Sequence, residues 1–345
     1  MQGYAAGVWL RNDAAMTAPL LAIENLKVTF HGDAGRLTHA VDGVSLALQR
    51  GRTLGVVGES GSGKSVTFLA VMGLLPRRTS EVAGRIRFDG LDLLTLPDPQ
   101  LRDLRGDRLA MIFQEPMTSL NPSYTIGEQI IEVFMRHRGL ARRDARRQAV
   151  EMLRRVRIPA PEERIDDFPH QLSGGMRQRA MIAIALACEP ALIIADEPTT
   201  ALDVTIQAQI LALMRDLKAA TDAAIVLITH DLGVVAEVCD DVAVMYAGEV
   251  VEQAPVEALF SAPEHPYTVG LMGSLPRLDQ QADRLAVIDG VVPDMTAPPA
   301  GCRFAPRCPF ADETCRTTPP PVVPIADARW SRCHKAPLEG LVPTV

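Results

Sequence analysis

The sequence predicts an α/β protein built on a parallel sheet covered by helices on both faces, followed by a small extension that contains cysteines. Short apolar runs alternate with helical segments from about residue 20 to residue 246, the pattern of a parallel sheet with crossover helices. One such run, residues 53–57, leads directly into a glycine-rich turn that opens a helix. After residue 275 the composition changes, because 12 of the 26 prolines and four of the six cysteines lie there.

The expected strands are short runs rich in Val, Ile and Leu, and the expected helices are longer segments with apolar residues three or four positions apart. The strands are residues 21–30, 41–48, 53–57, 84–88, 109–113, 192–195, 225–229 and 242–246. The helices are residues 64–75, 126–157, 173–187 and 204–219. The tail shows little periodicity, so we expect a small, loop-rich appendage there that needs a staple, such as a bound metal or a cross-link, to be stable.

Length and composition bound the function classes. A chain of 345 residues with 47% hydrophobic residues suits one large domain plus an appendage. The net charge of −7 gives no support to nucleic-acid binding as the main task. No apolar run approaches the roughly 18–20 residues that span a bilayer, so any membrane work must come through partner chains. Residues 1–19 lack a signal-peptide core and are expected to form a disordered leader.

The string from Gly58 to Ser65, GESGSGKS, has the spacing of a phosphate-binding loop, G-x-x-x-x-G-K-[ST]. Backbone N–H groups at a helix start attract polyphosphate, and glycines let the loop wrap it closely. Lys64 supplies a charge to the β- and γ-phosphates, and the Ser65 hydroxyl can ligate Mg²⁺. The residues expected to border the nucleotide are Gly58, Ser60, Gly61, Ser62, Gly63, Lys64, Ser65 and Val66. A chance glycine turn is the alternative, and the strand-loop-helix context argues against it.

Asp196 and Glu197 follow the buried strand at residues 192–195. Open α/β sheets place ligands at the carboxyl edge of their strands, so this pair is placed to hold magnesium and to poise a water. Solvation of a strand end would be the structural alternative, and the phosphate-binding loop upstream makes it the weaker interpretation.

A third string, Leu172-Ser-Gly-Gly-Met-Arg-Gln178, stands between the other two. With all three motifs the chain resembles the ATP-binding cassette (ABC) ATPases. The resemblance implies a P-loop nucleotide-binding domain over residues 20–262, with a RecA-like core, an antiparallel β subdomain and a helical subdomain. Residues 263–345 would then form the C-terminal extension.

The resemblance also implies roles for individual residues. Asp196 would hold Mg²⁺ through its water shell, and Glu197 would polarise the attacking water as general base. Gln114, after strand 109–113, corresponds to the glutamine that contacts magnesium and the water. His230, after strand 225–229, corresponds to the histidine that contacts the γ-phosphate. Lys64 completes the catalytic set.

Two such domains pack head to tail in the family. Ser173, Gly174 and Gly175 would therefore cap the γ-phosphate bound by the other chain, and Asp203 belongs to the loop that carries the signal across the interface. Phe30 occupies the position of an aromatic residue that stacks on adenine. A core phenylalanine closing a strand is an almost equal alternative for Phe30.

The extension resembles one branch of the family. His265-Pro-Tyr-Thr268 and Leu275-Pro-Arg277 are similar to the tail of ATPase subunits of oligopeptide, dipeptide and nickel importers. This implies ATP and Mg²⁺ as ligands and a peripheral position at the cytoplasmic face of the bacterial inner membrane. The implied partners are two permeases, a second, non-identical ATPase and an extracytoplasmic binding protein. Peptides are favoured over nickel as the cargo.

Cys302, Cys308, Cys315 and Cys333 have the spacing C-x5-C-x6-C-x17-C, which matches neither the usual zinc-finger nor the ferredoxin spacing. A cytoplasmic compartment argues against disulfides, and four thiols in a tail without an apolar core favour a metal staple. The resemblance implies a [4Fe–4S] cluster. Zinc and free thiols remain open as alternatives.

A soluble ABC ATPase that acts on nucleic acid or ribosomes is the competing function. Residues 136–157 are rich in arginine, but the segment also contains Asp144 and Glu151 and no interleaved aromatic residues. Ribosome-acting relatives carry two cassettes, whereas this chain carries one. No nucleic acid is therefore expected as a partner.

Overall fold

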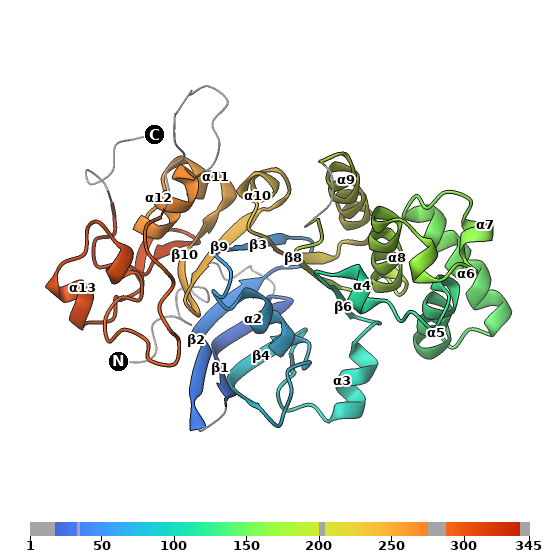
Figure 1. Cartoon of the computed structure of the whole chain (residues 1–345), viewed down its shortest axis with the longest axis horizontal. Coiled ribbons are helices and arrows are strands. Elements are labelled where there is room, and N and C mark those ends of the chain that lie inside the picture. Colours follow the sequence, from blue (N-terminus) through green and yellow to red (C-terminus); the bar gives the residue numbers. More distant parts are fainter. Residues whose placement is uncertain (1–17, 33–34, 200–203, 275–287, 339–345) are drawn as a thin grey trace. The chain divides into compact units, whose positions relative to one another are not determined.

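The computed structural model describes residues 18–32, 35–199, 204–274 and 288–338 (Figure 1). The chain divides into two compact units. The first unit comprises Met1–Gln49, Thr53–Leu94 and Ile228–Val345, and the second comprises Arg50–Arg52 and Thr95–Leu227. Of the leader predicted at residues 1–19, residues 1–17 lie outside the described residues.

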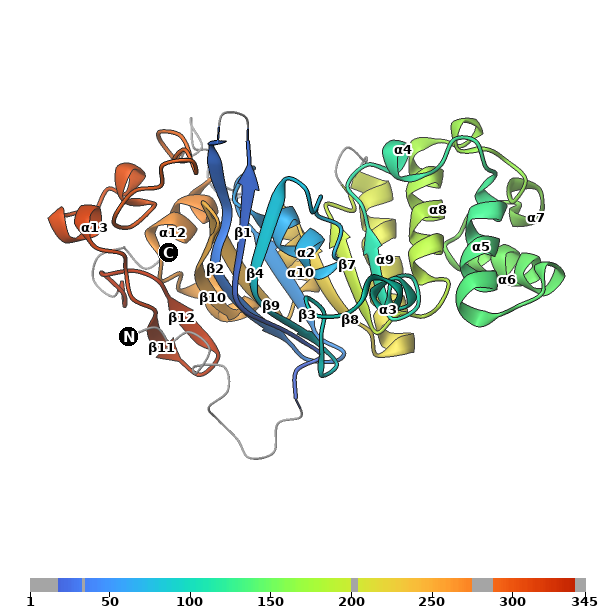
Figure 2. The same ribbon diagram turned by 90° about the horizontal axis from the view of Figure 1, so that it is seen from below.

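An antiparallel sheet forms one part of the first unit, with the strand order β2-β1-β4-β5 (Figure 2). Its strands are β1 (Leu21–His31), β2 (Leu37–Leu48), β4 (Ser80–Phe88) and β5 (Leu91–Asp92). The buried residues of β1 alternate until a bulge at Asn25, whose φ of 48° is left-handed, shifts the alternation by one position. The bulge thus keeps Leu26 and Val28 on the same buried face as Leu21 and Ile23.

A second run of strands in this unit has the order β11-β12-β10-β9-β3. Its strands are β3 (Thr53–Val57), β9 (Asp241–Tyr246), β10 (Glu249–Pro255), β11 (Val323–Ala326) and β12 (Arg329–Ser331). Strands β3 and β9 are parallel, and β12 pairs antiparallel with β10. The cysteine-containing extension therefore adds two strands to a sheet that begins next to the phosphate-binding loop.

The helices of the first unit are α2 (Lys64–Val71), α10 (Leu232–Val238), α11 (Val256–Ser261), α12 (Pro266–Gly273) and α13 (Glu313–Thr317), with a 3-10 turn, η3 (Ala305–Arg307). Among the described residues of the whole chain, no helix combines the length and the apolar character needed to cross a membrane.

The second unit combines a short sheet, in the order β8-β7-β6, with a group of helices. The strands are β6 (Leu109–Ile112), β7 (Leu192–Asp196) and β8 (Ala224–Ile228), whose last residue already belongs to the first unit. The helices are α3 (Asp98–Leu104), α4 (Pro116–Ser119), α5 (Ile126–Arg138), α6 (Arg142–Arg155), α7 (Pro161–Arg164), α8 (Gly174–Leu186) and α9 (Val204–Thr221), with η2 (Pro169–Gln171). Helices α5, α6 and α8 pack against one another (Figure 1).

Most predicted elements of the cassette are confirmed, and two differ. The helix expected at 64–75 ends at Val71, because Gly73 adopts a left-handed φ of 61°. The segment at 126–157 is two helices, separated where Gly139 caps α5 with a φ of 63°. The tail contains short strands and helices that its weak periodicity did not predict. The predicted α/β class, with its antiparallel β part and helical part, is confirmed.

Candidate nucleotide site and thiol-lined cavity

The glycine-rich loop joins the buried strand β3 to helix α2. Gly58 and Gly63 have φ values of 150° and 95°. A Cβ atom on Gly58 would lie 2.1 Å from the carbonyl oxygen of Met245, and one on Gly63 would lie 2.5 Å from that of Ala40. Only glycine fits at these two positions, so the loop conformation depends on the backbone packing around it.

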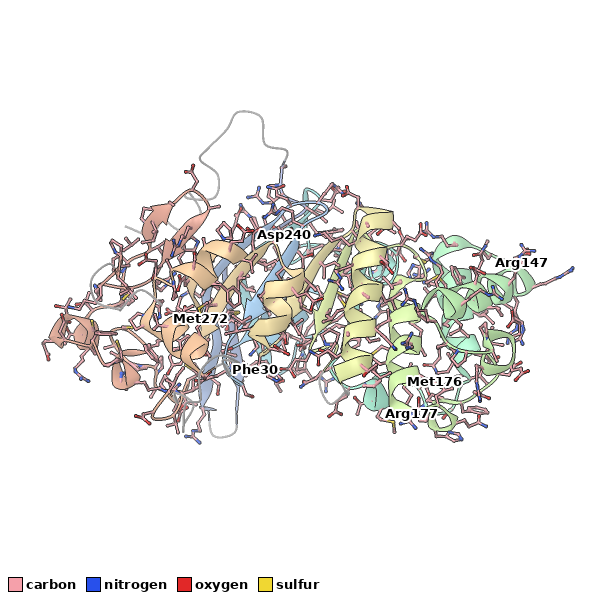
Figure 3. All side chains as sticks on the ribbon, turned by 90° about the horizontal axis from the view of Figure 1, so that it is seen from above. Phe30, Arg147, Met176, Arg177, Asp240 and Met272 are labelled. Atoms are coloured by element: carbon pink, nitrogen blue, oxygen red, sulfur yellow. The ribbon has the colours of Figure 1, made fainter. Side chains whose placement is uncertain are left out.

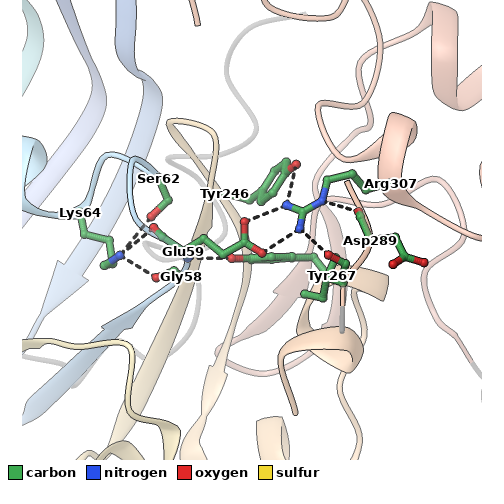
Figure 4. A network of polar contacts seen from close by, with 9 residues as sticks. Gly58, Glu59, Ser62, Lys64, Tyr246, Tyr267, Asp289 and Arg307 are labelled. Carbon is green, nitrogen blue, oxygen red and sulfur yellow. Dashed lines mark hydrogen bonds and ion pairs between the residues drawn. The ribbon is translucent and has the colours of Figure 1, made fainter. Parts of the chain in front are cut away.

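Lys64 folds back over this loop (Figure 4). Its Nζ donates to the carbonyl oxygen of Gly58 at 2.6 Å, to that of Glu59 at 2.9 Å and to Ser62 Oγ at 3.4 Å. Ser62 is buried, Ser60 and Gly61 are exposed, and Ser65 and Val66 are half-buried. The middle of the loop, Ser60 and Gly61, is thus exposed to solvent, and the ammonium group of Lys64 is fixed beside the loop backbone. This arrangement suits the binding of a polyanion.

The two predicted carboxylates end strand β7 in the second unit. Asp196 is buried as the last residue of the strand, and Glu197 follows it with a left-handed φ of 46°. A non-glycine residue in this region costs on the order of 1 kcal/mol, and such strain concentrates at functional sites. Glu197 Oε2 accepts a hydrogen bond from Gln114 Nε2 at 2.9 Å. The structure therefore brings two of the predicted catalytic residues together.

His230 and Phe30 belong to the first unit. The N–H of Thr229 donates to the carbonyl oxygen of Val56 at 3.2 Å, which places His230, an exposed residue, near the end of β3 where the loop begins. Phe30 lies on β1 opposite Thr38 and Ser80 and is half-buried (Figure 3). This intermediate burial leaves both interpretations of Phe30 standing.

Ser173 caps helix α8. Its Oγ accepts from the N–H of Met176 at 3.4 Å, and a Cβ on Gly174 would meet no atom of the described residues within 4 Å. Gly175 faces Ile206 on α9. The capping end of α8 is therefore open on the side of Gly174. Asp203, the remaining predicted residue of this group, lies outside the described residues.

Gln178 carries no predicted role, yet it connects α8 to the segment that follows Glu197. Its buried Nε2 donates to the carbonyl oxygen of Pro198 at 2.6 Å. Arg179 beside it is buried too and donates to the carbonyl oxygen of Val156 at 2.7 Å. The signal in the sequence was that these two polar residues directly precede the apolar run at 180–186, whereas their burial and their fixed partners are seen in the structure.

Most of the arginines of residues 136–157 are engaged in ion pairs within the second unit. Arg146 forms a bidentate pair with Asp166 at 2.8 and 2.7 Å, and Arg147, which projects from α6 in Figure 3, lies 3.2 Å from Asp144. The other pairs are Arg136–Asp103, Arg138–Asp107, Arg142–Glu128, Arg154–Glu151, Arg154–Glu162, Arg155–Glu189 and Arg157–Asp216. Acidic partners therefore balance most of the positive charge of this segment.

All four cysteines of the extension line one cavity, together with His265, Pro266, Phe304, Ala305, His334 and Lys335. Burial raises the pKa of Cys302 to about 11, and it also raises the pKa of Cys308 and of Cys333. Nearby thiols add to these shifts, because several thiolates cannot ionise side by side without a cation. Among the described residues, no group of three or more His, Cys, Asp or Glu side chains is placed to hold a metal ion.

Comparison with known proteins agrees with this architecture. A family model described as "ABC transporter" matches residues 41–200, and one described as "Oligopeptide/dipeptide transporter, C-terminal region" matches residues 251–315. The dipeptide transport ATP-binding proteins of Bacillus subtilis and Escherichia coli are each 50% identical over 315 residues. That alignment covers 91% of this chain and 94% and 96% of theirs.

Solved structures give the same answer for the fold. The dimeric ATP-binding cassette MJ0796, in a post-hydrolysis state bound to ADP and phosphate, aligns with a TM-score of 0.62 at 28% identity. It covers 68% of this chain and 98% of its own. CbiO1 of Clostridium perfringens aligns with a TM-score of 0.58, also at 28% identity, over 71% of this chain and 91% of its own. The chain belongs to the ATP-hydrolysing subunits of the ABC transporter family, in the branch that carries the oligopeptide/dipeptide transporter C-terminal region.

Proposed function

We propose that ATP hydrolysis by this chain drives the uptake of di- or oligopeptides through two permease subunits at the cytoplasmic face of the bacterial inner membrane. The observation that carries the proposal is the match of residues 251–315 to the oligopeptide/dipeptide transporter C-terminal region. The proposal is also supported by the 50% identity of this chain to two dipeptide transport ATP-binding proteins, over 91% of its length.

The nucleotide chemistry is assigned to the predicted residues. The loop from Gly58 to Gly63 and the ammonium of Lys64 bind the ATP phosphates. Ser65, Gln114 and Asp196 would hold Mg²⁺, which neutralises phosphate charge when bound. Glu197 takes the proton of the attacking water, and His230 contacts the γ-phosphate. The hydrogen bond from Gln114 to Glu197 and the left-handed backbone of Glu197 support this assignment.

A second, non-identical ATPase chain completes the site. Ser173 and Gly174 would cap the γ-phosphate bound by that chain, with Gly175 and Asp203 in the same interface. The support for this step is local: Ser173 already caps a helix, and the space beside Gly174 is open. ATP then joins the two chains, and hydrolysis separates them.

The permeases are proposed to dock on the segment that follows Gln114. Two large hydrophobic residues are exposed there, Met117 at 58% and Tyr124 at 53%, and Phe113, directly before Gln114, is exposed as well. Exposed apolar side chains close together in sequence mark contact surfaces more often than chance. An extracytoplasmic binding protein would deliver the cargo to the permeases.

The four cysteines are proposed to hold a [4Fe–4S] cluster, with zinc as the alternative. The support is their placement, because all four line one cavity. The cluster would act as a staple for an extension that has little apolar core.

The proposal is tested by trapping the complex. Tagged Glu197→Gln chain is expressed in its native host, and the membranes are solubilised with ATP and Mg²⁺ present. Mass spectrometry then identifies the chains that co-purify. Two multi-spanning permeases and a second ATPase are expected, and Lys64→Ala, which should not bind ATP, is the matched control.

Ribosomal or DNA-repair proteins in place of permeases would overturn the importer assignment. With permeases present, the associated binding protein decides the cargo. It is purified and titrated separately with dipeptides, with longer peptides and with Ni²⁺. Binding of Ni²⁺ without peptide binding would replace the peptide proposal with the nickel importer.

A further inference from the structure

A glutamate in the phosphate-binding loop is held by an arginine of the cysteine-containing extension. Arg307 donates from Nη1 to Glu59 Oε2 at 2.7 Å and from Nη2 to Glu59 Oε1 at 3.0 Å, a bidentate pair (Figure 4). The Arg307 side chain is only 5% exposed, and that of Glu59 is 28% exposed. Because the pair is largely shielded from water, it is stronger than a typical surface ion pair.

The backbone of Glu59 is held from the same side. Its N–H donates to the hydroxyl oxygen of Tyr267 on α12 at 2.8 Å. Tyr267 is fully buried, and this burial raises its pKa, so the hydroxyl stays neutral. Both the carboxylate and the N–H of Glu59 are thus engaged outside the nucleotide-binding side of the loop.

The charge of Glu59 makes these contacts matter. A carboxylate in a loop that binds a polyphosphate repels it, because like charges at close range raise the free energy of the bound state. Arg307 neutralises that carboxylate and fixes its direction. Without Arg307, Glu59 is free to turn toward the phosphates, and the backbone at Gly58 and Glu59, which Lys64 also contacts, loses one of its anchors.

Arg307 does not line the thiol-lined cavity, but it lies next to residues that do. It precedes Cys308 in the chain, and its guanidinium lies 6.0 Å from the ring centroid of Phe304, which lines the cavity with the four cysteines. Its other hydrogen bonds go to the carbonyl oxygens of Ile288 and Asp289, at 3.0 and 2.9 Å, and to the hydroxyl oxygen of Tyr246 at 3.4 Å. The segment from Cys302 to Cys308 therefore contacts the cavity on one side and the loop on the other.

We propose that Arg307 is a positioning residue of the phosphate-binding loop, through which the thiol-lined cavity sets the affinity of the chain for ATP. The proposal rests on the nucleotide site assigned above to the loop from Gly58 to Ser65. It adds a residue from outside the cassette motifs to that site, and it gives the cysteine cavity an effect on nucleotide binding.

The test is a double-mutant cycle on the full chain, read by equilibrium binding of a fluorescent ATP analogue, mant-ATP. Arg307→Gln should raise Kd about tenfold, the loss expected for one shielded bidentate pair. In the Glu59→Gln background, by contrast, Arg307→Gln should change Kd by less than about twofold, because no carboxylate then needs restraint. Arg307→Lys should give an intermediate value.

A merely structural role for Arg307 predicts other results. If the extension only needed this arginine to fold, Arg307→Gln and the double variant would lose affinity equally, which would overturn the proposal. The loss in Arg307→Gln should also shrink at high ionic strength, because it arises from charge repulsion. A loss independent of salt would likewise count against it.

Arg329→Gln is the matched control, since Arg329 pairs with Glu264 within the same unit and has no contact with the loop. It should leave Kd unchanged even where it lowers the melting temperature.

Cys308→Ser tests the cavity. In the chain that retains Glu59, this substitution should raise the Kd for mant-ATP. In the Glu59→Gln chain, the same substitution should leave Kd unchanged. Failure of the wild-type chain to bind mant-ATP would contradict the nucleotide site itself. Normal binding by Arg307→Gln would overturn only the positioning role.

Discussion

Gln114 donates a hydrogen bond from Nε2 to Glu197 Oε2 at 2.9 Å, although 83 residues separate the two in the sequence. Strands β6 and β7 pair in parallel, with Ile112 opposite Ala195, so the residues that follow each strand emerge at the same edge of the sheet. The left-handed backbone of Glu197 turns its side chain back toward Gln114. A carboxylate held by an amide donor is oriented without being neutralised, which suits a general base.

Glu197→Gln should therefore bind ATP normally and hydrolyse it at least about 100-fold more slowly, because the amide cannot accept the proton of the attacking water. Steady-state phosphate release gives the rate, and mant-ATP titration gives the affinity. Hydrolysis at the wild-type rate would show that another group is the base.

Lys64→Ala should lose nucleotide binding, with Kd raised about 100-fold or more, because the point charge that binds the phosphates is removed. The carbonyl oxygens of Gly58 and Glu59 also lose their donor. Lys27→Ala is the control: this lysine pairs with Asp42 on the antiparallel sheet and is 51% exposed. A Lys64→Ala chain that bound ATP as tightly as the control would contradict the proposed loop.

Anaerobically purified chain should contain about four iron and four acid-labile sulfide per molecule if the cysteines hold a [4Fe–4S] cluster. Cys315→Ser should lose this iron and lower the melting temperature, since the buried Cys315 is one of the four proposed ligands. Cys188→Ser, which removes a buried cysteine of the second unit, should retain the iron. Stoichiometric zinc without iron would favour the zinc alternative.

Glu252 makes the stability of the first unit depend on pH. Burial raises its pKa from 4.5 to about 7, and its Oε2 has no hydrogen-bond partner in the part of the chain that the structure describes. The folded state thus holds a proton that the unfolded state releases above pH 4.5. The contribution of this carboxyl to stability is present below pH 4.5 and is lost as the pH rises to about 7.

Glu252→Gln should therefore raise the free energy of unfolding at pH 8, by roughly 1–3 kcal/mol, and change it little at pH 4.5. The amide oxygen can still accept from the N–H of Glu264, as Oε1 does at 2.7 Å. Denaturant unfolding at the two pH values measures the difference. An equal effect at both would show that the carboxyl is not the titrating group.

The elements of the cassette could be predicted because they depend on local patterns. The run Leu192–Asp196 consists mostly of apolar residues, and the structure buries all of it. The glycines of the phosphate-binding loop adopt positive φ, which glycine allows. Residue type alone therefore indicates the strand and the loop. The strands of the extension were missed because they are short, and β11 is also half-exposed: it alternates intermediate and exposed residues and pairs with β12. A short strand of this kind is defined by its neighbour more than by its own sequence.

The sequence by itself determined the fold class, the family and the residues that carry the nucleotide chemistry, because spacing within a few residues decides how a loop meets phosphate. Only the tertiary structure decided which distant groups meet. Arg307 and Glu59 are 248 residues apart, and no local pattern links them. The four cysteines reach one cavity for the same reason: contacts between remote segments depend on strand pairing and packing, which the spacing of residues along the chain does not encode.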